Sequence, residues 1–307
     1  MQRRNLWASV VFVSFVALLA SYAQQAQEDY LDVFTVQVKP EKRAEFDSIA
    51  KKMVAANRQN NGDAWITMET VYGPSDRVTF LSTRHSYAEI EKASGQFFGA
   101  IQKTYGKAAT DKLFQDFSQC IVSSRGELRR RRWDLGSSRP SDAAALAKLV
   151  GESRWLRTTV VHVRPGQVAA FEGLLQDIKA AREKDPSSPP LLVSQAVAGQ
   201  EGTVFYVTML QSSMAGFDGI PPLQKVLGEE GYAKFLKSNI DTVADSETII
   251  SRFLPALSNA PQEIAAASPD YWTPKADASV NAKAKAAKSP AVNASEKTKM
   301  PEQKKEQ

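Results

Sequence analysis

The feature that most constrains this chain is an internal repeat. Residues 30–46 (YLDVFTVQVKPEKRAEF) align without gaps to residues 155–171 (WLRTTVVHVRPGQVAAF), and both contain V-x-V-[KR]-P-x-x-x-A-x-F. Two further blocks match in the same order: 65–82 with 191–208, which places Val78 over Val204, and 112–132 with 234–254. Three matches in one order indicate a duplication, so we expect the same structural unit to occur twice.

Each copy shows the residue pattern of a β-α-β-β-α-β unit. An alternating β-branched strand ends at Pro40 or Pro165, and a helix follows with apolar residues near 3.6 spacing, beginning at Phe46 or Phe171. Two strands joined by a turn come next, at 73–76 and 199–202. A longer helical stretch (97–122 and 221–244) then leads into a last strand (124–133 and 246–254).

We therefore predict an α+β fold of two tandem ferredoxin-like β-α-β-β-α-β repeats, at 27–136 and 154–258, packing as an intrachain α/β-barrel pseudo-dimer. Residues 137–153 form the predicted linker, which includes a short helical piece. Residues 259–307 are rich in Ala, Lys, Pro, Ser and Asn, with little to bury, and this composition predicts a disordered tail.

The repeat order and its V-x-V-[KR]-P-x-x-x-A-x-F opening resemble the dimeric α/β-barrel superfamily, with the NIPSNAP-type and antibiotic-biosynthesis-monooxygenase-type families closest in style. The resemblance covers about 30–133 and 155–254. It implies two sheets packed face to face, with ligands held between sheet and helices or inside the barrel. A tandem copy further implies that one chain builds the pseudo-dimer by itself.

The N-terminus has the pattern of a secretory signal peptide at 1–23. Arg3 and Arg4 precede an apolar run of about 15 residues, which is shorter than the roughly 20 needed to cross a bilayer, and Ala23 ends a small-x-small cleavage pattern. We expect export to the periplasm or medium, with no membrane span after processing; an uncleaved anchor is the alternative. The lone Cys120 lies in an apolar stripe and is expected to be a buried small side chain.

The net charge of +5 does not indicate a nucleic-acid partner. Arg3 with Arg4, and the lysine-rich tail, each contribute +2, which leaves the body of the chain nearly neutral. A nucleic-acid-binding domain concentrates far more positive charge. The tail suggests at most a loose contact with anionic envelope polymers, and a solubilising tail is the commoner case.

Strand parity separates the candidate site residues from the core. Phe34, Val36 and Val38 are expected to face the helices, with Thr159, Val161 and Val163 in the second copy. The alternate residues, which end in Gln37 and His162, are expected to face the barrel interior. Glu69 lies on the next strand and pairs by repeat with Gln195.

Four consecutive arginines in 128-LRRRRWDL-135 fall on the predicted last strand of the first copy. The pleat places Arg129, Arg131 and Trp133 on one face and Arg130 with Arg132 on the other. Arginines inside a sheet need paired carboxylates or a bound anion, because an unpaired buried charge is costly. Pairing with Glu69 or Glu127 is one interpretation, and anion binding is the other.

Few residue patterns point to a specific chemistry. The two histidines lack the spacing of a metal-ligand motif, and no glycine-rich phosphate loop is present. The second helices also lack the histidine that heme-binding relatives use. We therefore expect no cofactor. Our main expectation is a non-catalytic protein that binds a small apolar or anionic molecule, or an envelope partner. Its candidate ligand contacts are Gln37, Glu69, Arg129, Arg131 and His162. The alternative is a cofactor-independent monooxygenase or isomerase in the barrel that uses His162 with Glu69, inside aromatic walls.

Overall fold

A computed structural model describes residues 29–185 and 187–273 of the chain. The predicted signal peptide and the tail from residue 274 lie outside the described residues. No described helix is both long and apolar enough to cross a membrane.

The described chain contains two similar runs of elements, which we call the first half (residues 30–131) and the second half (residues 155–253). The first half comprises β1 (Tyr30–Val38), α2 (Arg43–Gln59), β2 (Ile66–Tyr72), β3 (Arg77–Arg84), α3 (Tyr87–Tyr105), α4 (Lys107–Gln119) and β4 (Ile121–Arg131). The second half comprises β5 (Trp155–Val163), α6 (Val168–Arg182), β6 (Leu192–Ala198), β7 (Thr203–Gln211), α7 (Leu223–Thr242) and β8 (Val243–Phe253). The remaining α-helices are α5 (Ala143–Glu152) between the halves, and α8 (Gln262–Ala267) and α9 (Pro269–Trp272) after them.

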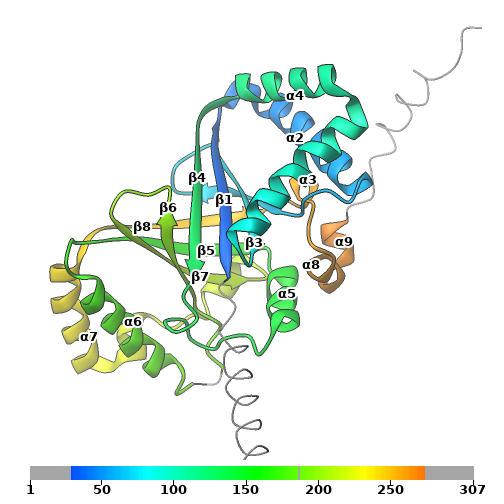
Figure 1. Ribbon diagram of the computed structural model, residues 1–307. Coiled ribbons are helices and arrows are strands. Elements are labelled where there is room, and N and C mark those ends of the chain that lie inside the picture. The colour runs from blue at the N-terminus through cyan, green and yellow to red at the C-terminus, as the bar shows by residue number, and fades with distance from the viewer. Residues whose placement is uncertain (1–28, 186, 274–307) are drawn as a thin grey trace, which may run out of the picture. The chain divides into compact units, whose positions relative to one another are not determined.

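The eight strands form one closed antiparallel barrel in the order β1-β3-β2-β8-β5-β7-β6-β4. Within each half the strand order is the same, and the halves meet at two seams, β2 with β8 and β4 with β6. Figure 1 shows α2, α3 and α4 grouped against the outside of the barrel on the first half, and α6 with α7 on the second. The α+β class and the closed barrel agree with the prediction.

The side-chain faces follow from the pleat. Val36 and Val38 pack beneath α2 against Phe46, and Val161 with Val163 pack beneath α6 against Phe171, as predicted. The alternate residues of these strands therefore face the barrel interior. There Leu156 joins an apolar cluster whose other strand members are Ile66, Met68, Leu210 and Phe253.

The long second helix of each half is interrupted by a glycine. Gly106 separates α3 from α4 with φ 77° and ψ 165°, and Gly228 breaks α7 with φ 72° and ψ 173°. Residues with a Cβ rarely adopt a positive φ, so each break depends on glycine. The predicted helix at 97–122 is thus two helices, and it begins earlier, where the Ser86 side chain accepts a hydrogen bond from the Glu89 amide.

Two sequence expectations need correction. The register pairs Val36 with Val78 but Val161 with Phe205, so Phe205, and not Val204, takes the place of Val78 in the second half. The tail was expected to start at residue 259, yet residues up to 273 are packed. Trp272 is fully buried, and its indole Nε1 donates to the Gly151 carbonyl at 2.8 Å.

Candidate functional site

The two residues expected to act together, Glu69 and His162, lie on opposite faces of the sheet. Glu69 points toward the helices, where its carboxylate accepts from Arg43 of α2 at 2.7 Å and from Arg252 of β8 at 2.5 Å. His162 points into the barrel, because its neighbours Val161 and Val163 pack beneath α6. Glu69 and His162 therefore cannot contact the same bound substrate.

The four-arginine run is divided as predicted. On the inner face, Arg129 donates through Nε to Glu127 at 2.9 Å, and its guanidinium lies 3.4 Å from the centre of the Tyr206 ring. On the outer face, Arg132 pairs with Asp134 and with Glu172 of α6. Two candidates remain: Gln37 lies on the inner face opposite residues 77 and 123, and Arg131 lies on the inner face of β4, two residues beyond Arg129.

Glu127 is the centre of a buried hydrogen-bond network inside the barrel. Its carboxylate accepts from the Tyr206 hydroxyl at 2.7 Å, from Gln200 Nε2 at 2.7 Å and from Arg129. Burial, with the hydrogen bond to Glu127, raises the pKa of Tyr206 to about 12, although Arg129 opposes the shift. Every partner is satisfied within the network, so Glu127 and Arg129 form a structural pair.

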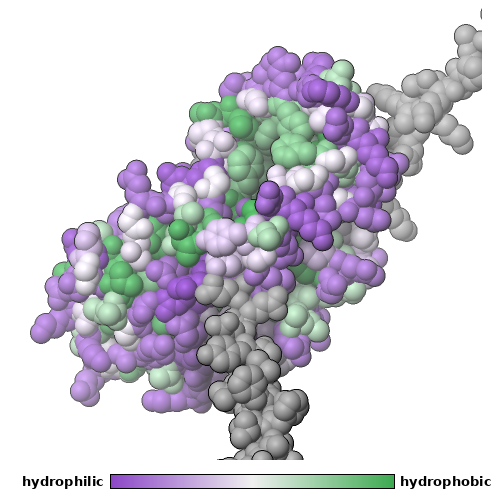
Figure 2. All heavy atoms as spheres, viewed as in Figure 1, coloured by the Kyte–Doolittle hydropathy of each residue, from purple (hydrophilic) through white to green (hydrophobic). Residues whose placement is uncertain are grey.

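A cavity lies elsewhere, between the outer face of the first-half sheet and helices α2, α3 and α4. Its volume is about 610 Å³. Figure 2 shows apolar surface in the hollow between the strands and α3 with α4. The aromatic rings that line it are Phe34, Trp65, Phe80, Phe97, Phe98, Phe114 and Phe117. Such a shape and lining are typical of a site for a small organic molecule.

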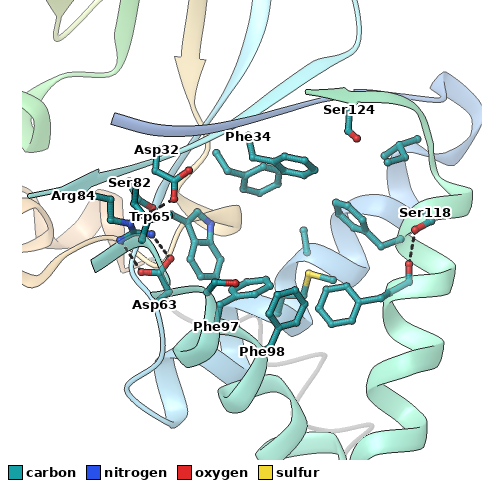
Figure 3. Close-up of a pocket in the computed structure, with 18 residues that line it drawn as sticks. Asp32, Phe34, Asp63, Trp65, Ser82, Arg84, Phe97, Phe98, Ser118 and Ser124 are labelled. Atoms are coloured by element: carbon teal, nitrogen blue, oxygen red, sulfur yellow. Dashed lines mark hydrogen bonds and ion pairs between the residues drawn. The ribbon is translucent and has the colours of Figure 1, made fainter. Parts of the chain in front are cut away.

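Charged side chains gather at one end of this cavity (Figure 3). Arg84 of β3 is buried and binds Asp63 through both terminal nitrogens, at 2.9 and 2.6 Å. Asp32 of β1 forms a longer ion pair with the same guanidinium, with its Oδ2 3.5 Å from Arg84 Nε. Asp63 therefore holds Arg84 by two short hydrogen bonds, whereas Asp32 makes only the longer ion pair and also lines the cavity.

The surroundings of Asp32 shift the ionisation of its carboxyl to higher pH. Burial raises the pKa of this carboxyl and the negative charge of Asp63 raises it further, while Arg84 acts in the opposite direction. A carboxyl with a raised pKa beside an apolar cavity has the properties of a general base or acid. Our sequence reasoning missed Asp32; the available signal was an acid on the same strand face as Phe34 and Val36.

The polar cluster occurs in one half only. The gapless repeat alignment places Arg157 at the position of Asp32 and Thr159 at the position of Phe34. Arg157 lies over the Phe217 ring at 5.5 Å. The second half therefore offers a cation where the first offers a carboxylate.

The residues of the cavity do not fit heme. Protein ligands of heme iron are histidine, cysteine, methionine or tyrosine. Among the lining residues only Met53 is of these types, and a thioether serves beside a histidine, which this cavity lacks. Nor do any three His, Cys, Asp or Glu side chains within the described ranges gather closely enough to hold a metal ion.

Comparison with known proteins gives matches to solved structures alone. Neither protein-family models nor curated proteins match this chain. An anthrone oxidase-like protein matches with 14% identity, covering 75% of this chain and 92% of its own, at a TM-score of 0.46. The chlorite dismutase of Candidatus Nitrospira defluvii matches with 10% identity, covering 78% and 95%, at 0.43. A heme-binding protein from Thermus thermophilus matches with 12% identity, covering 76% and 93%, at 0.42.

These names contradict our main expectation. We expected a non-catalytic binding or envelope-associated protein, whereas the matched structures are named as an oxidase-like protein, a dismutase and a heme-binding protein. We correct that expectation, and with it the expectation that the chain is not an enzyme. At identities of 10–14% and TM-scores of 0.42–0.46 these matches assign no function to the chain, so the function has to be argued from the cavity.

Proposed function

We propose that this protein is a cofactor-independent enzyme, a monooxygenase or an isomerase, that acts on a small aromatic molecule in the first-half cavity. The observation that carries the proposal is the position of Asp32 at the charged end of a cavity walled by aromatic rings. The site lies outside the barrel, in contrast to the barrel site that we expected from the sequence.

The aromatic residues of the cavity bind the substrate, and its charged residues carry out the proton transfer. The rings hold a planar apolar substrate by stacking and exclude water. Asp32 removes a proton from an activated C–H bond, and its raised pKa makes the carboxylate a stronger base than an exposed aspartate. Arg84, fixed by Asp63, lies where it stabilises the negative charge that develops on a substrate oxygen.

Two outcomes follow from this proton transfer. In the oxygenase, the carbanion is oxidised by O2: a C–O bond forms, the O–O bond breaks, and a CH2 group becomes C=O with release of one water that carries both hydrogens. In the isomerase, Asp32 returns the proton to a different carbon and no O2 is used. Both need the same base, and the uptake of O2 distinguishes them.

Anthrone is a suitable probe because its CH2 group lies between two aromatic rings and is acidic. We expect the purified chain to convert it with uptake of one O2 per molecule, followed with an oxygen electrode and by absorbance. Asp32→Asn should abolish turnover but keep binding of the probe, whereas Asp218→Asn changes an exposed aspartate outside the cavity and should leave both turnover and binding unchanged. Turnover of anthrone by the Asp32→Asn variant at the wild-type rate would refute the role of Asp32.

We further propose that the two halves arose by tandem duplication and form a ferredoxin-like pseudo-dimer of the antibiotic-biosynthesis-monooxygenase type. The identical strand order of the halves and the matched breaks at Gly106 and Gly228 support this. Export remains part of the proposal, and cell fractionation with N-terminal sequencing of the mature protein would test it.

A further inference from the structure

Arg131 differs in its contacts from Arg129 and Arg132, its neighbours in the four-arginine run. Its side chain lies on the inner face of β4, two residues beyond Arg129. Arg129 pairs with Glu127, but no carboxylate among the described residues lies within 4.0 Å of Arg131. Its Nε is buried without a hydrogen bond, and its Nη2 reaches only Thr83 Oγ1, at 3.4 Å.

Asp29, the acid whose charge acts on Arg131, is hydrogen-bonded to two other side chains. Asp29 accepts a hydrogen bond from the Trp133 indole Nε1 at 3.2 Å, and its other oxygen contacts His85 Nδ1 at 2.9 Å. Its charge acts on Arg131 only from a distance. Desolvation consequently lowers the pKa of Arg131 to about 10, although Asp29 opposes this.

A second guanidinium group contacts the same indole ring. The guanidinium of Arg131 lies 5.3 Å from the centre of the Trp133 ring, and that of the exposed Arg139 lies 4.7 Å from the same ring. Two positive charges beside one indole attract an anion. The ring holds both side chains in place, and the Thr83 hydroxyl adds a hydrogen-bond donor.

We propose that Arg131 and Arg139 form an oxyanion-binding site at this end of the barrel, which takes a carboxylate or a phosphate group. The planar guanidinium fork matches the two oxygens of either group. Binding supplies the hydrogen-bond partner that the buried Nε of Arg131 lacks and compensates a partly buried charge without a carboxylate partner among the described residues. The site lies on the opposite face of the sheet from the aromatic cavity, so it is independent of the proposed catalysis.

The test is isothermal titration calorimetry of the full chain with inorganic phosphate and, separately, with acetate, against sodium chloride at equal ionic strength. We expect saturable binding of at least one of the two at one site per chain. Arg131→Met and Arg139→Met should each weaken it at least tenfold. Arg164→Met removes the same charge from an exposed position and should leave the affinity unchanged.

Each outcome decides the proposal. Binding of phosphate alone assigns a phosphate site, and binding of acetate alone assigns a carboxylate site. Heats equal to those of sodium chloride for both anions, or equal losses in Arg131→Met and Arg164→Met, would overturn it. If Arg131→Met does not fold, Arg131→Lys keeps the charge but removes the fork, and unchanged affinity in that variant would also count against the site.

Discussion

The two inner-face arginines of β4 should respond in opposite directions when each is replaced by methionine. Without an anion, the charge of Arg131 is a cost to the fold. Its pKa is lowered from the ordinary arginine value of 12.5 to about 10. At about 1.4 kcal/mol for each pKa unit, the charged side chain costs the folded state about 3 kcal/mol. Its contact with the Trp133 ring returns about 1 kcal/mol. Because the folded pKa is the lower one, the cost applies in full at every pH below about 10.

Arg131→Met is therefore expected to stabilise the fold by about 2 kcal/mol at pH 7, or to raise Tm by about 4–8 °C. Arg129→Met should destabilise it by about 3 kcal/mol, because it leaves the buried Glu127 carboxylate without its cation. Urea unfolding in an anion-poor buffer, with phosphate and carboxylates removed, measures both variants. A loss of stability in Arg131→Met as large as that in Arg129→Met would refute the claim that Arg131 is unpaired.

Three further predictions follow from described contacts. Because burial raises the pKa of Asp32, kcat/KM for a converted substrate should begin to fall on acidification at a pH above the ordinary aspartate pKa of about 4. An acid limb at or below pH 4 would contradict the assignment. The Asp32→Asn variant should not lower Tm. Trp272→Ala should cost about 3–5 kcal/mol in urea unfolding, since a fully buried ring and its hydrogen bond are lost, and an unchanged midpoint would show that α9 does not pack. Gly199→Ala should lower Tm more than Gly202→Ala, although both glycines have a positive φ. A Cβ at residue 199 collides with the Gly126 backbone across the β4–β6 seam, whereas a Cβ at residue 202 meets open space. Equal effects of the two substitutions would refute the seam contact.

The sequence predicted the barrel well because its information is local. Alternation in 30–38 and 155–163 identifies which side chains point inward, and the pleat is a short-range property. The same rule divided the arginine run correctly between Arg129 and Arg132. Parity failed at Glu69, which we grouped with inward-facing candidates, because the orientation of one strand relative to the next depends on register and not on alternation.

Strand alternation could not predict the aromatic cavity. Its acid, Asp32, meets Asp63 and Arg84 only when a strand, a loop and a second strand come together in space. The space itself depends on how α3 and α4 diverge at Gly106. Trp272 was missed for the opposite reason, since one buried side chain inside an alanine- and lysine-rich stretch hardly alters its composition.

A barrel closed by one chain has a different stoichiometry from a barrel closed by two identical chains. A symmetric dimer must present every outer-face residue twice, so two carboxylates and two cavities would occur per barrel. Here Asp32 in β1 has Arg157 as its counterpart in β5, and the two outer faces differ in charge. We therefore expect any molecule that contacts Asp32 to bind with a stoichiometry of one per chain. Because the barrel has one such site, its binding curve should show no cooperativity within a barrel.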